Sequence, residues 1–171
     1  MEVRKAQTSD LSKVMEIIES GRTALHKQRL PQWQNGQGPD EMSMGQLIEE
    51  KSCFLAIIDQ EAVAVGCLIP GVDEVYTAIT NGTWVETGPY LSIHRFAVLS
   101  GNAGRGIGRR FLMSLVNEGV KMGYHDFRID THPDNQGMIR VIQSCGFVYR
   151  GEVQFPIPHG ERVAFQLICS Q

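Results

Sequence analysis

The sequence lacks the patterns that mark several large classes of protein. Its four cysteines form no C-x-x-C pair and its five histidines show no H-x-x-x-H or H-E-x-x-H spacing, so no metal site is expected. No apolar run reaches the roughly eighteen residues of a membrane span, and the amino-terminal MEVRKAQTSD has no apolar signal-peptide core. We therefore expect a cytoplasmic protein with reduced thiols and no membrane partner.

Positive charge is also scarce. The 16 Lys and Arg residues are outnumbered by 19 Asp and Glu residues, which gives a net charge of −3. No basic stripe is present, so nucleic acid is not an expected partner. The glycine-rich stretch 104–108 lacks the Lys-Ser/Thr pair of a Walker A loop, and Arg109 or Phe111 stands where a dinucleotide fingerprint needs its third glycine. A nucleotide-binding regulatory domain is therefore disfavoured.

The length and composition indicate one globular domain, which we assign to residues 1–171. Hydrophobic residues make up 42% of the chain, enough for a sizeable core. The apolar patterns predict an α+β fold. The predicted strands are 2–6, 53–58, 62–69, 90–98, 126–131, 147–154 and 162–169, with a further strand start at 84–87. The predicted helices are 8–21, 40–51, 106–122 and 135–145, while 70–82 carries no clear pattern.

The segment 91–110, LSIHRFAVLSGNAGRGIGRR, carries the most specific signal. A predicted strand runs through a glycine-rich turn into a predicted helix, and such a junction can bind an anion through backbone N–H groups and the helix dipole. The alternative is a plain turn. The run Gly104-Arg105-Gly106-Ile107-Gly108 resembles the coenzyme A pyrophosphate loop of the GNAT superfamily of N-acetyltransferases, Gln/Arg-x-x-Gly-x-Gly/Ala. Ala103 departs from the first position of that pattern.

A second motif carries the same resemblance. Asn135 stands near a predicted helix start, and Gly146 and Phe147 follow eleven and twelve residues later, which is the GNAT spacing. The run IHRFAV followed by FRIDTHPDN resembles one bacterial GNAT subfamily, and Trp33-Gln34 fits the amino-terminal loop of that subfamily. The match covers residues 90–150.

The resemblance implies a fold and a cosubstrate. GNAT proteins have a central mixed, mostly antiparallel sheet flanked by helices, and a splayed pair of parallel strands, here 90–98 and 126–131, holds the acyl-CoA arm. A β-bulge near Ala97 is expected to free backbone N–H groups. Acetyl-CoA is the expected cosubstrate. The residues that the resemblance assigns to it are Phe96, Ala97, Val98, Ala103, Gly104, Arg105, Gly106, Ile107, Gly108, Arg109 and Asn135.

The catalytic residues are less well defined, because the sequence departs from the family at two positions. Some members have Glu where Ser92 stands, and many have Tyr where Ile142 stands. His94 is our candidate general base, because imidazole exchanges protons near neutral pH; the alternative is a packed strand residue. Tyr149 is a candidate general acid by residue type, with water as the alternative. A backbone N–H near Val98 is the candidate oxyanion donor.

Trp33 and His132 are the candidate acceptor residues. Trp33 lies in the polar stretch 30–39 and either covers the acceptor or plugs the core. His132 ends a predicted strand and either lines the site or orders its loop. Three carboxylates are candidates for holding a cationic amine, although ordinary surface charge is the simpler interpretation: Glu86, Asp130 and Glu152.

These observations predict an N-acetyltransferase that moves an acetyl group from acetyl-CoA to a primary amine of a small molecule or peptide by direct attack. The alternative is a non-catalytic acyl-CoA-binding or sensing module. A homodimer is compatible with the closing strands. The fold alone does not name the acceptor amine.

Overall fold

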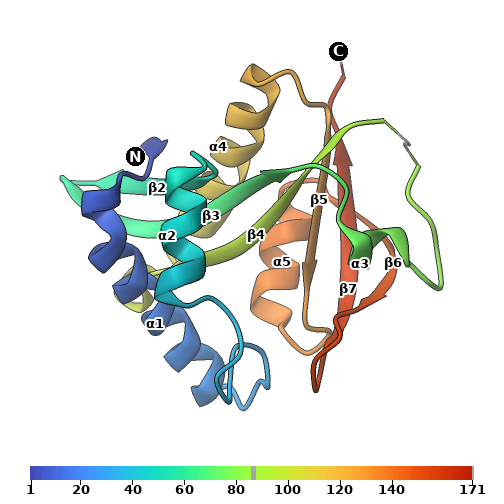
Figure 1. The fold of residues 1–171 in the computed structure, drawn as a ribbon, viewed down its shortest axis with the longest axis horizontal. Helices are drawn as coiled ribbons and strands as arrows, with labels where there is room; N and C mark the ends of the chain where they lie inside the picture. The colour runs from blue at the N-terminus through green and yellow to red at the C-terminus, as the bar shows by residue number, and fades with distance from the viewer. Residues whose placement is uncertain (86–87, 171) are drawn as a thin grey trace.

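One mixed sheet with helices on both faces forms the protein. The computed structural model describes residues 1–85 and 88–170, and within them seven strands pair in the order β1-β2-β3-β4-β5-β7-β6. Strands β4 and β5 run parallel, and the other neighbours are antiparallel. Helices α1 and α2 cover one face, and α4 and α5 cover the other (Figure 1). The predicted α+β fold is confirmed.

The strands agree with the sequence-based predictions to within about two residues. Their bounds are β1 Glu2–Lys5, β2 Cys53–Ile58, β3 Glu61–Pro70, β4 Tyr90–Val98, β5 Asp126–Thr131, β6 Val148–Gln154 and β7 Glu161–Ile168. The strand start expected at 84–87 is not found at 84–85, and its remainder lies outside the described residues.

The helices agree less well. Their bounds are α1 Leu11–Lys27, α2 Glu41–Glu49, α3 Glu74–Thr77, α4 Ile107–Lys121 and α5 Gln136–Ser144. The predicted end of the first helix near Gly21 is wrong, because α1 continues to Lys27. A Cβ on Gly21 would lie 3.2 Å from the Ala97 side chain and 3.4 Å from the Trp33 ring. The glycine therefore permits close packing within a helix rather than ending it.

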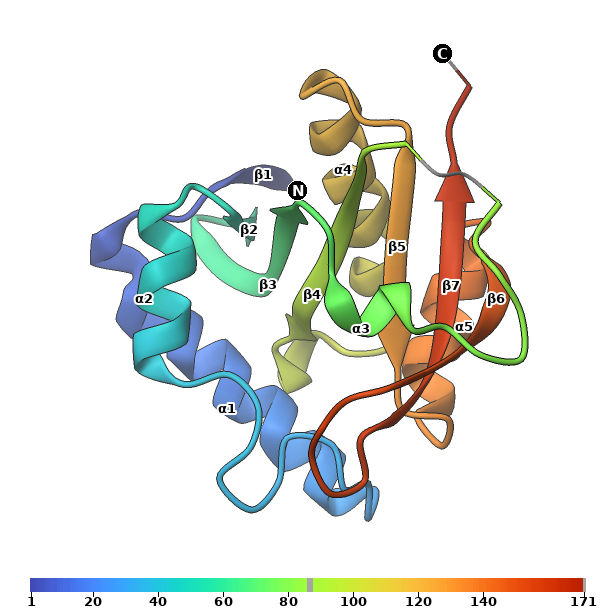
Figure 2. The same cartoon turned by 45° about the vertical axis from the view of Figure 1, so that its right-hand side comes forward.

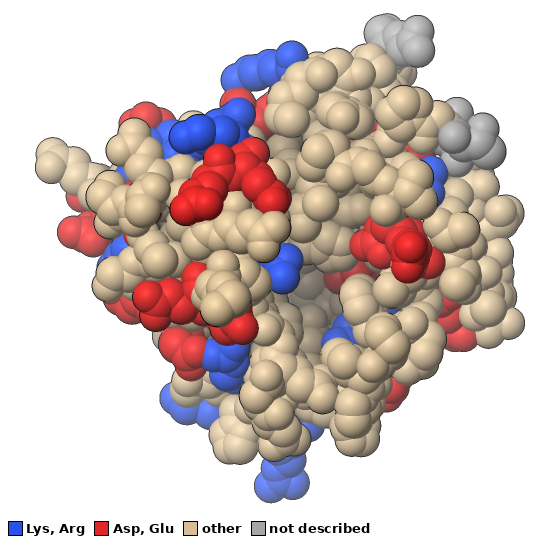
Figure 3. Space-filling view, viewed as in Figure 1, with Lys and Arg blue, Asp and Glu red and all other residues tan. Residues whose placement is uncertain are grey.

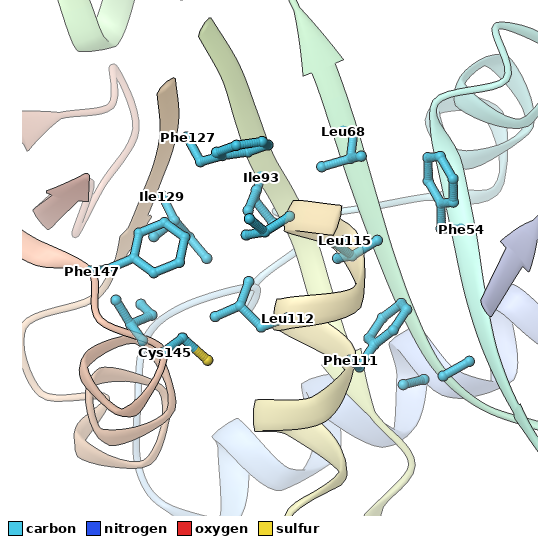
Figure 4. Packing of buried hydrophobic residues seen from close by; sticks show 14 of the residues in the cluster. Phe54, Leu68, Ile93, Phe111, Leu112, Leu115, Phe127, Ile129, Cys145 and Phe147 are labelled. Carbon is cyan, nitrogen blue, oxygen red and sulfur yellow. The ribbon is translucent and has the colours of Figure 1, made fainter. Parts of the chain in front are cut away.

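The two faces of the sheet have separate cores. Leu112 and Leu115 of α4 pack with Phe127 and Ile129 of β5 on one face (Figure 4). Ile17 of α1 packs with α2 and with alternate residues of β2 and β3 on the other face. Successive strand residues point to opposite faces, so β4 contributes to both cores. None of the described helices is long and apolar enough to cross a membrane.

Strands β4 and β5 separate halfway along their length. They pair from Tyr90 and Asp126 up to Ile93 and Ile129, and β4 then continues unpaired on that side to Val98. Figure 2 shows the two strands diverging toward the bottom of the view. The pairing ends just before a bulge in β4, where Arg95 has a φ of 54°.

The bulge requires space on the neighbouring strand. Two β4 residues, Arg95 and Phe96, lie between the register pairs that flank the single β3 residue Gly66. A Cβ on Gly66 would lie 2.8 Å from Leu115 Cδ1 and 3.3 Å from the Phe96 ring. Glycine therefore lets the bulged strand and α4 approach β3 closely. The β-bulge expected near Ala97 is present, at the two preceding residues.

Candidate active site

A cavity opens where β4 and β5 separate. Its volume is about 700 Å³, and its wall comes from the α1–α2 connection, the β3–α3 connection, both diverging strands and the β6–β7 turn. Figure 3 shows the hollow near the middle of this face, with Lys or Arg atoms and Asp or Glu atoms at its rim. Parts of the chain that are distant in sequence therefore meet around one cavity.

The glycine-rich segment forms the entry to α4. Gly104 and Gly106 have φ values of 76° and 72°, in the left-handed region that favours glycine. Gly106 is the N-cap of α4, and the first N–H groups of a helix have no partner within it. Gly108 lies in the first turn, near Val141 and Val98. The segment can therefore hold an anion through backbone donors.

The unpaired edge of β4 also presents backbone donors. Leu99 N–H donates to Val63 O at 2.8 Å, on the β3 side. Because successive backbone groups of a strand alternate in direction, the N–H groups of Val98 and Phe96 point to the opposite side, into the gap. Ala97 instead packs under α1. This arrangement suits main-chain hydrogen bonds to an extended ligand.

Asn135, which follows β5, is hydrogen bonded to the α1–α2 connection. It is the N-cap of α5, and its Oδ1 accepts a hydrogen bond from Met138 N–H at 3.1 Å. Its Nδ2 donates to Gln32 Oε1 at 3.2 Å. Both residues line the cavity. The bond therefore connects the α1–α2 connection to the start of α5 across the mouth of the gap.

His94 is the first β4 residue beyond the paired segment, and acidic groups surround it. Its Nε2 lies 3.1 Å from Asp73 Oδ2, and its Nδ1 lies 3.8 Å from Asp130 Oδ1. The Tyr76 hydroxyl donates to Asp130 at 2.6 Å, and the ring of Tyr76 lies 5.6 Å from that of His94. Arg162 Nε approaches Asp130 at 3.8 Å. The imidazole is thus oriented by a carboxylate.

The two carboxyl groups beside His94 have pKa values shifted in opposite directions. The pKa of Asp73 is lowered, first because His94 hydrogen bonds to its carboxylate. The pKa of Asp130 is raised by burial, against the opposing effects of His94, Tyr76 and Arg162. Burial also raises the pKa of Tyr76 well above its ordinary value and lowers that of Arg162. Asp73 is therefore the carboxylate that most readily carries charge beside His94.

The structure brings some predicted residues to the cavity. His94, Phe96, Ala97, Asn135 and Trp33 line it. Trp33 also packs against the core beneath α1, and its carbonyl accepts a hydrogen bond from Arg22 Nε at 3.0 Å. Trp33 therefore both borders the cavity and packs on the core, so this one position fits both of the alternatives given for it.

Other predicted residues lie elsewhere. Tyr149 lies on β6, is 46% exposed and packs edge-on against Phe165 rather than facing the cavity. His132 is buried but outside the cavity wall, with its Nδ1 accepting from Asp134 N–H at 3.2 Å and its Nε2 3.4 Å from Glu161. It therefore orders its own loop.

The remaining predicted positions give a mixed result. Arg109 Nε donates to Ser144 O at 3.2 Å, so this guanidinium holds the end of α5. Ile142, at the position where many GNAT members have Tyr, is fully buried in the core. Glu152 contacts Asn81, away from the cavity wall, and Glu86 lies outside the described residues. Asp130, by contrast, is part of the His94 cluster.

Sequence reasoning missed Asp73, Tyr76 and Arg162. Asp73 precedes α3 and Tyr76 lies in it, where the sequence has no periodic pattern, and Arg162 is the second residue of β7. A possible signal for Asp73 was its place one residue before an acidic helix start, where Asp is a preferred N-cap. The described part of the chain brings together no group of three His, Cys, Asp or Glu side chains suited to a metal ion.

Comparisons with known proteins agree with this geometry. The model of the acetyltransferase (GNAT) family matches residues 21–147. A GNAT-family acetyltransferase from Streptococcus agalactiae is 30% identical, with a TM-score of 0.90, and the alignment covers 99% of this chain and 96% of that one. No relative is found among curated proteins.

Two more distant structures share the fold. YncA from Salmonella typhimurium, solved with its cofactor acetyl-CoA, is 17% identical with a TM-score of 0.72, covering 99% of this chain and 94% of that one. A ribosomal-protein-alanine N-acetyltransferase from Brucella melitensis is 18% identical with a TM-score of 0.72, covering 99% and 100%. With a family model over most of its length and a close structural relative of the same family, this chain belongs to the acetyltransferase (GNAT) family.

Proposed function

We propose that this chain is an acetyl-CoA-dependent N-acetyltransferase that acetylates a primary amine of a small molecule or peptide by direct attack. One observation carries the proposal: β4 and β5 separate at Ile93 and Ile129, and the next residue of β4 is His94, held by Asp73. Family membership and the acetyl-CoA bound to the Salmonella protein support it.

The residues present fit acetyl-CoA. Backbone N–H groups at Gly106 and the first turn of α4 would hold the pyrophosphate, with Arg105 as an exposed cation nearby. The free N–H groups of Phe96 and Val98 would meet the extended arm, with Asn135 on the opposite side. When bound, acetyl-CoA supplies a thioester whose carbonyl carbon forms the new N–C bond as its C–S bond breaks.

His94 is the proposed general base. With Nε2–H donating to Asp73, Nδ1 keeps its lone pair and accepts the proton that the amine loses. Asp73 fixes the tautomer and the orientation of the ring and is therefore a positioning residue. The N–H of Val98 is the proposed donor to the carbonyl oxygen as negative charge develops there.

The leaving thiolate takes its proton from solvent in this proposal. Tyr149 packs against Phe165 at a distance from the cavity, and Ile142 lies in the core, so neither supplies an acid. Ser92 and Thr131 are among the residues of the cavity wall, and their hydroxyls are buried without partners among the described residues. We expect Ile142→Tyr to leave transfer intact where it folds.

Thermal shift with acetyl-CoA, CoA, ATP and NAD, followed by thiol release with a panel of primary amines, tests the proposal. At a hundredfold excess over its dissociation constant a ligand adds about 2.7 kcal/mol, or roughly 5–10 °C here. We expect a shift with both CoA forms and turnover that His94→Gln lowers. A shift without turnover of any amine would instead support the acyl-CoA-binding module.

Three further expectations belong to the proposal. We assign residues 1–171 to one domain, because one sheet runs through the described residues. A cytoplasmic location is supported by free cysteines, among them the facing pair Cys53 and Cys67 on β2 and β3. A homodimer built on the closing strands β6 and β7 is compatible with the fold, and light scattering can test it.

A further inference from the structure

The cavity wall contains a cation that the proposed chemistry does not use. Arg95 follows His94 on β4 and lines the cavity. Its Nε is buried and has no hydrogen-bond partner among the described residues. Burying a guanidinium nitrogen without a partner is costly, and such a group calls for a ligand or an ordered water.

The neighbouring charges already have partners within the protein. Asp73 holds His94, and Asp130 accepts from Tyr76. Arg162 donates through Nη1 to the carbonyls of His159 and Glu161, at 2.8 Å and 2.7 Å, and its Nε approaches Asp130. These charged groups therefore have partners within the cavity wall, whereas the described structure contains no hydrogen bond or ion pair of Arg95.

Two exposed acidic residues are the remaining candidates for partners of Arg95. Glu74 is exposed at the cavity rim. Asp40 has a lowered pKa, chiefly through hydrogen bonds from Ser43 and to a lesser extent through the charge of Arg95. The described structure contains no ion pair of Arg95 with either residue. Its charge is therefore available to a ligand.

The bulge directs this side chain into the cavity. Phe96 stacks on Phe111 of α4, with ring centroids 5.4 Å apart, on the far face of the sheet. Phe96 also borders the cavity, and Arg95, at a φ of 54°, lines it together with His94. Left-handed backbone is uncommon for a residue other than glycine. The bulge thus places a base and a cation side by side on one wall.

We propose that Arg95 binds a carboxylate of the acceptor, so that the substrate is a small amino acid-like molecule carrying both an amine and a carboxylate. The inference rests on the proposed function and names its substrate class. Consecutive Cα atoms lie about 3.8 Å apart, so one small molecule can reach both side chains. The amine meets His94 between Asp73 and Asp130, and the carboxylate pairs with the planar guanidinium, which matches its geometry.

A comparison of acids with their amides tests the inference. The wild-type protein is given acetyl-CoA with a mixture of the standard L-amino acids, or with a mixture of their amides, which keep the amine and lose the carboxylate charge. We expect thiol release to be at least about tenfold faster with the acids, since a charge-assisted hydrogen bond is at stake. Mass spectrometry then identifies the acetylated product.

Variants of Arg95 provide the matched comparison. We expect Arg95→Gln to bring the acid-to-amide rate ratio close to one and Arg95→Lys to keep an intermediate ratio. The exposed α5 residue Arg140 serves as control, and Arg140→Gln should leave the ratio unchanged. As a readout without turnover, calorimetry with the identified N-acetyl product and CoA should show binding that weakens about tenfold or more in Arg95→Gln.

The outcomes separate this inference from the proposed function. Equal rates with acids and amides, or an unchanged ratio in Arg95→Gln, would overturn the carboxylate site and leave the acetyltransferase in place. Absence of turnover with acids, amides and the corresponding decarboxylated amines would overturn both. If Arg95→Gln does not fold, the wild-type acid-to-amide ratio decides alone.

Discussion

Replacing Asp73 with asparagine removes the carboxylate that holds His94 while keeping nearly the same side-chain shape. Asn is also a good N-cap, so the hydrogen bond that Asp73 Oδ1 accepts from Val75 N–H at 3.0 Å can be kept. The helix α3 should therefore stay in place. The amide Nδ2 of the new side chain then faces His94 Nε2 and donates to it, so the substitution removes both the charge and the acceptor that keeps the ring proton on Nε2.

The expected magnitude follows from the contact between the two side chains. A hydrogen bond to a charged group contributes about 1.5–3 kcal/mol, against about 0.5–1.5 kcal/mol for a neutral one. The His94 and Asp73 side chains are 19% and 22% exposed, which places the difference at the lower end. Because the substitution also favours the proton on Nδ1, the atom that must accept it, kcat should fall by at least about tenfold, which corresponds to about 1.4 kcal/mol. The KM for acetyl-CoA should not change.

A double-mutant cycle tests whether Asp73 acts on kcat through His94 or independently of it. His94→Gln removes the base and should lower kcat by about a hundredfold or more. If Asp73 acts through His94, adding Asp73→Asn to His94→Gln should cost almost nothing further. Losses that multiply to about a thousandfold would refute the reasoning. Asp59→Asn, an exposed carboxylate in the β2–β3 turn, is the matched control.

The pH dependence of the effect provides a second check. Because the pKa of Asp73 is lowered, its carboxylate stays charged at every pH above the ordinary Asp value of about 3.9. Asp73 should therefore add no limb of its own to the kcat/KM profile at neutral pH, whereas His94→Gln should abolish the acidic limb. An acidic limb that survives in His94→Gln would exclude His94 as the base.

Three further predictions concern stability and the glycine segment. Gly119→Ala should destabilise by about 1–2 kcal/mol, because its Cβ would clash with the Phe127 ring, whereas Gly45→Ala, with its nearest contact at 3.9 Å, should stabilise by about 0.5–1 kcal/mol; urea unfolding measures both. The pKa of Asp10 is lowered, chiefly by Arg4, so its stabilisation is present above about pH 4 and lost as pH falls through the lowered value. Asp10→Asn should accordingly weaken the acid dependence of the melting temperature, and an unchanged acid limb would contradict this. Gly106→Ala, at a φ of 72°, should cost about 1 kcal/mol and weaken acetyl-CoA binding measured by calorimetry; unchanged affinity would mean that this segment does not hold the pyrophosphate.

The elements with strong local patterns were predictable from the sequence. The alternation in Tyr90–Val98 and the helical period after Gly106 fix a strand and a helix within one short segment. The first helix shows the limit of that reasoning. Gly21 weakens the local helical propensity, but close packing against Ala97 and Trp33 keeps the helix intact. A contact between distant segments overrides the local preference there.

The site was predictable only where it lies on those same segments. His94 is part of the predicted strand, whereas its partner Asp73 comes 21 residues earlier, before a helix of four residues. Tyr149 was chosen by residue type. The strand order places β6 beyond β7, two strands away from β5, and local patterns do not determine strand order.

Gly66 has a consequence for how this protein tolerates change. It lies on β3, on the side of the bulge away from the gap between β4 and β5. A methyl group there would press on Leu115, Phe111 and Phe96 at once. A side chain larger than methyl would displace these neighbours, and Phe96 is part of the bulge beside His94 and Arg95. In a saturation mutagenesis experiment scored by growth or activity, substitutions at Gly66 should be as deleterious as substitutions at a residue that binds the substrate.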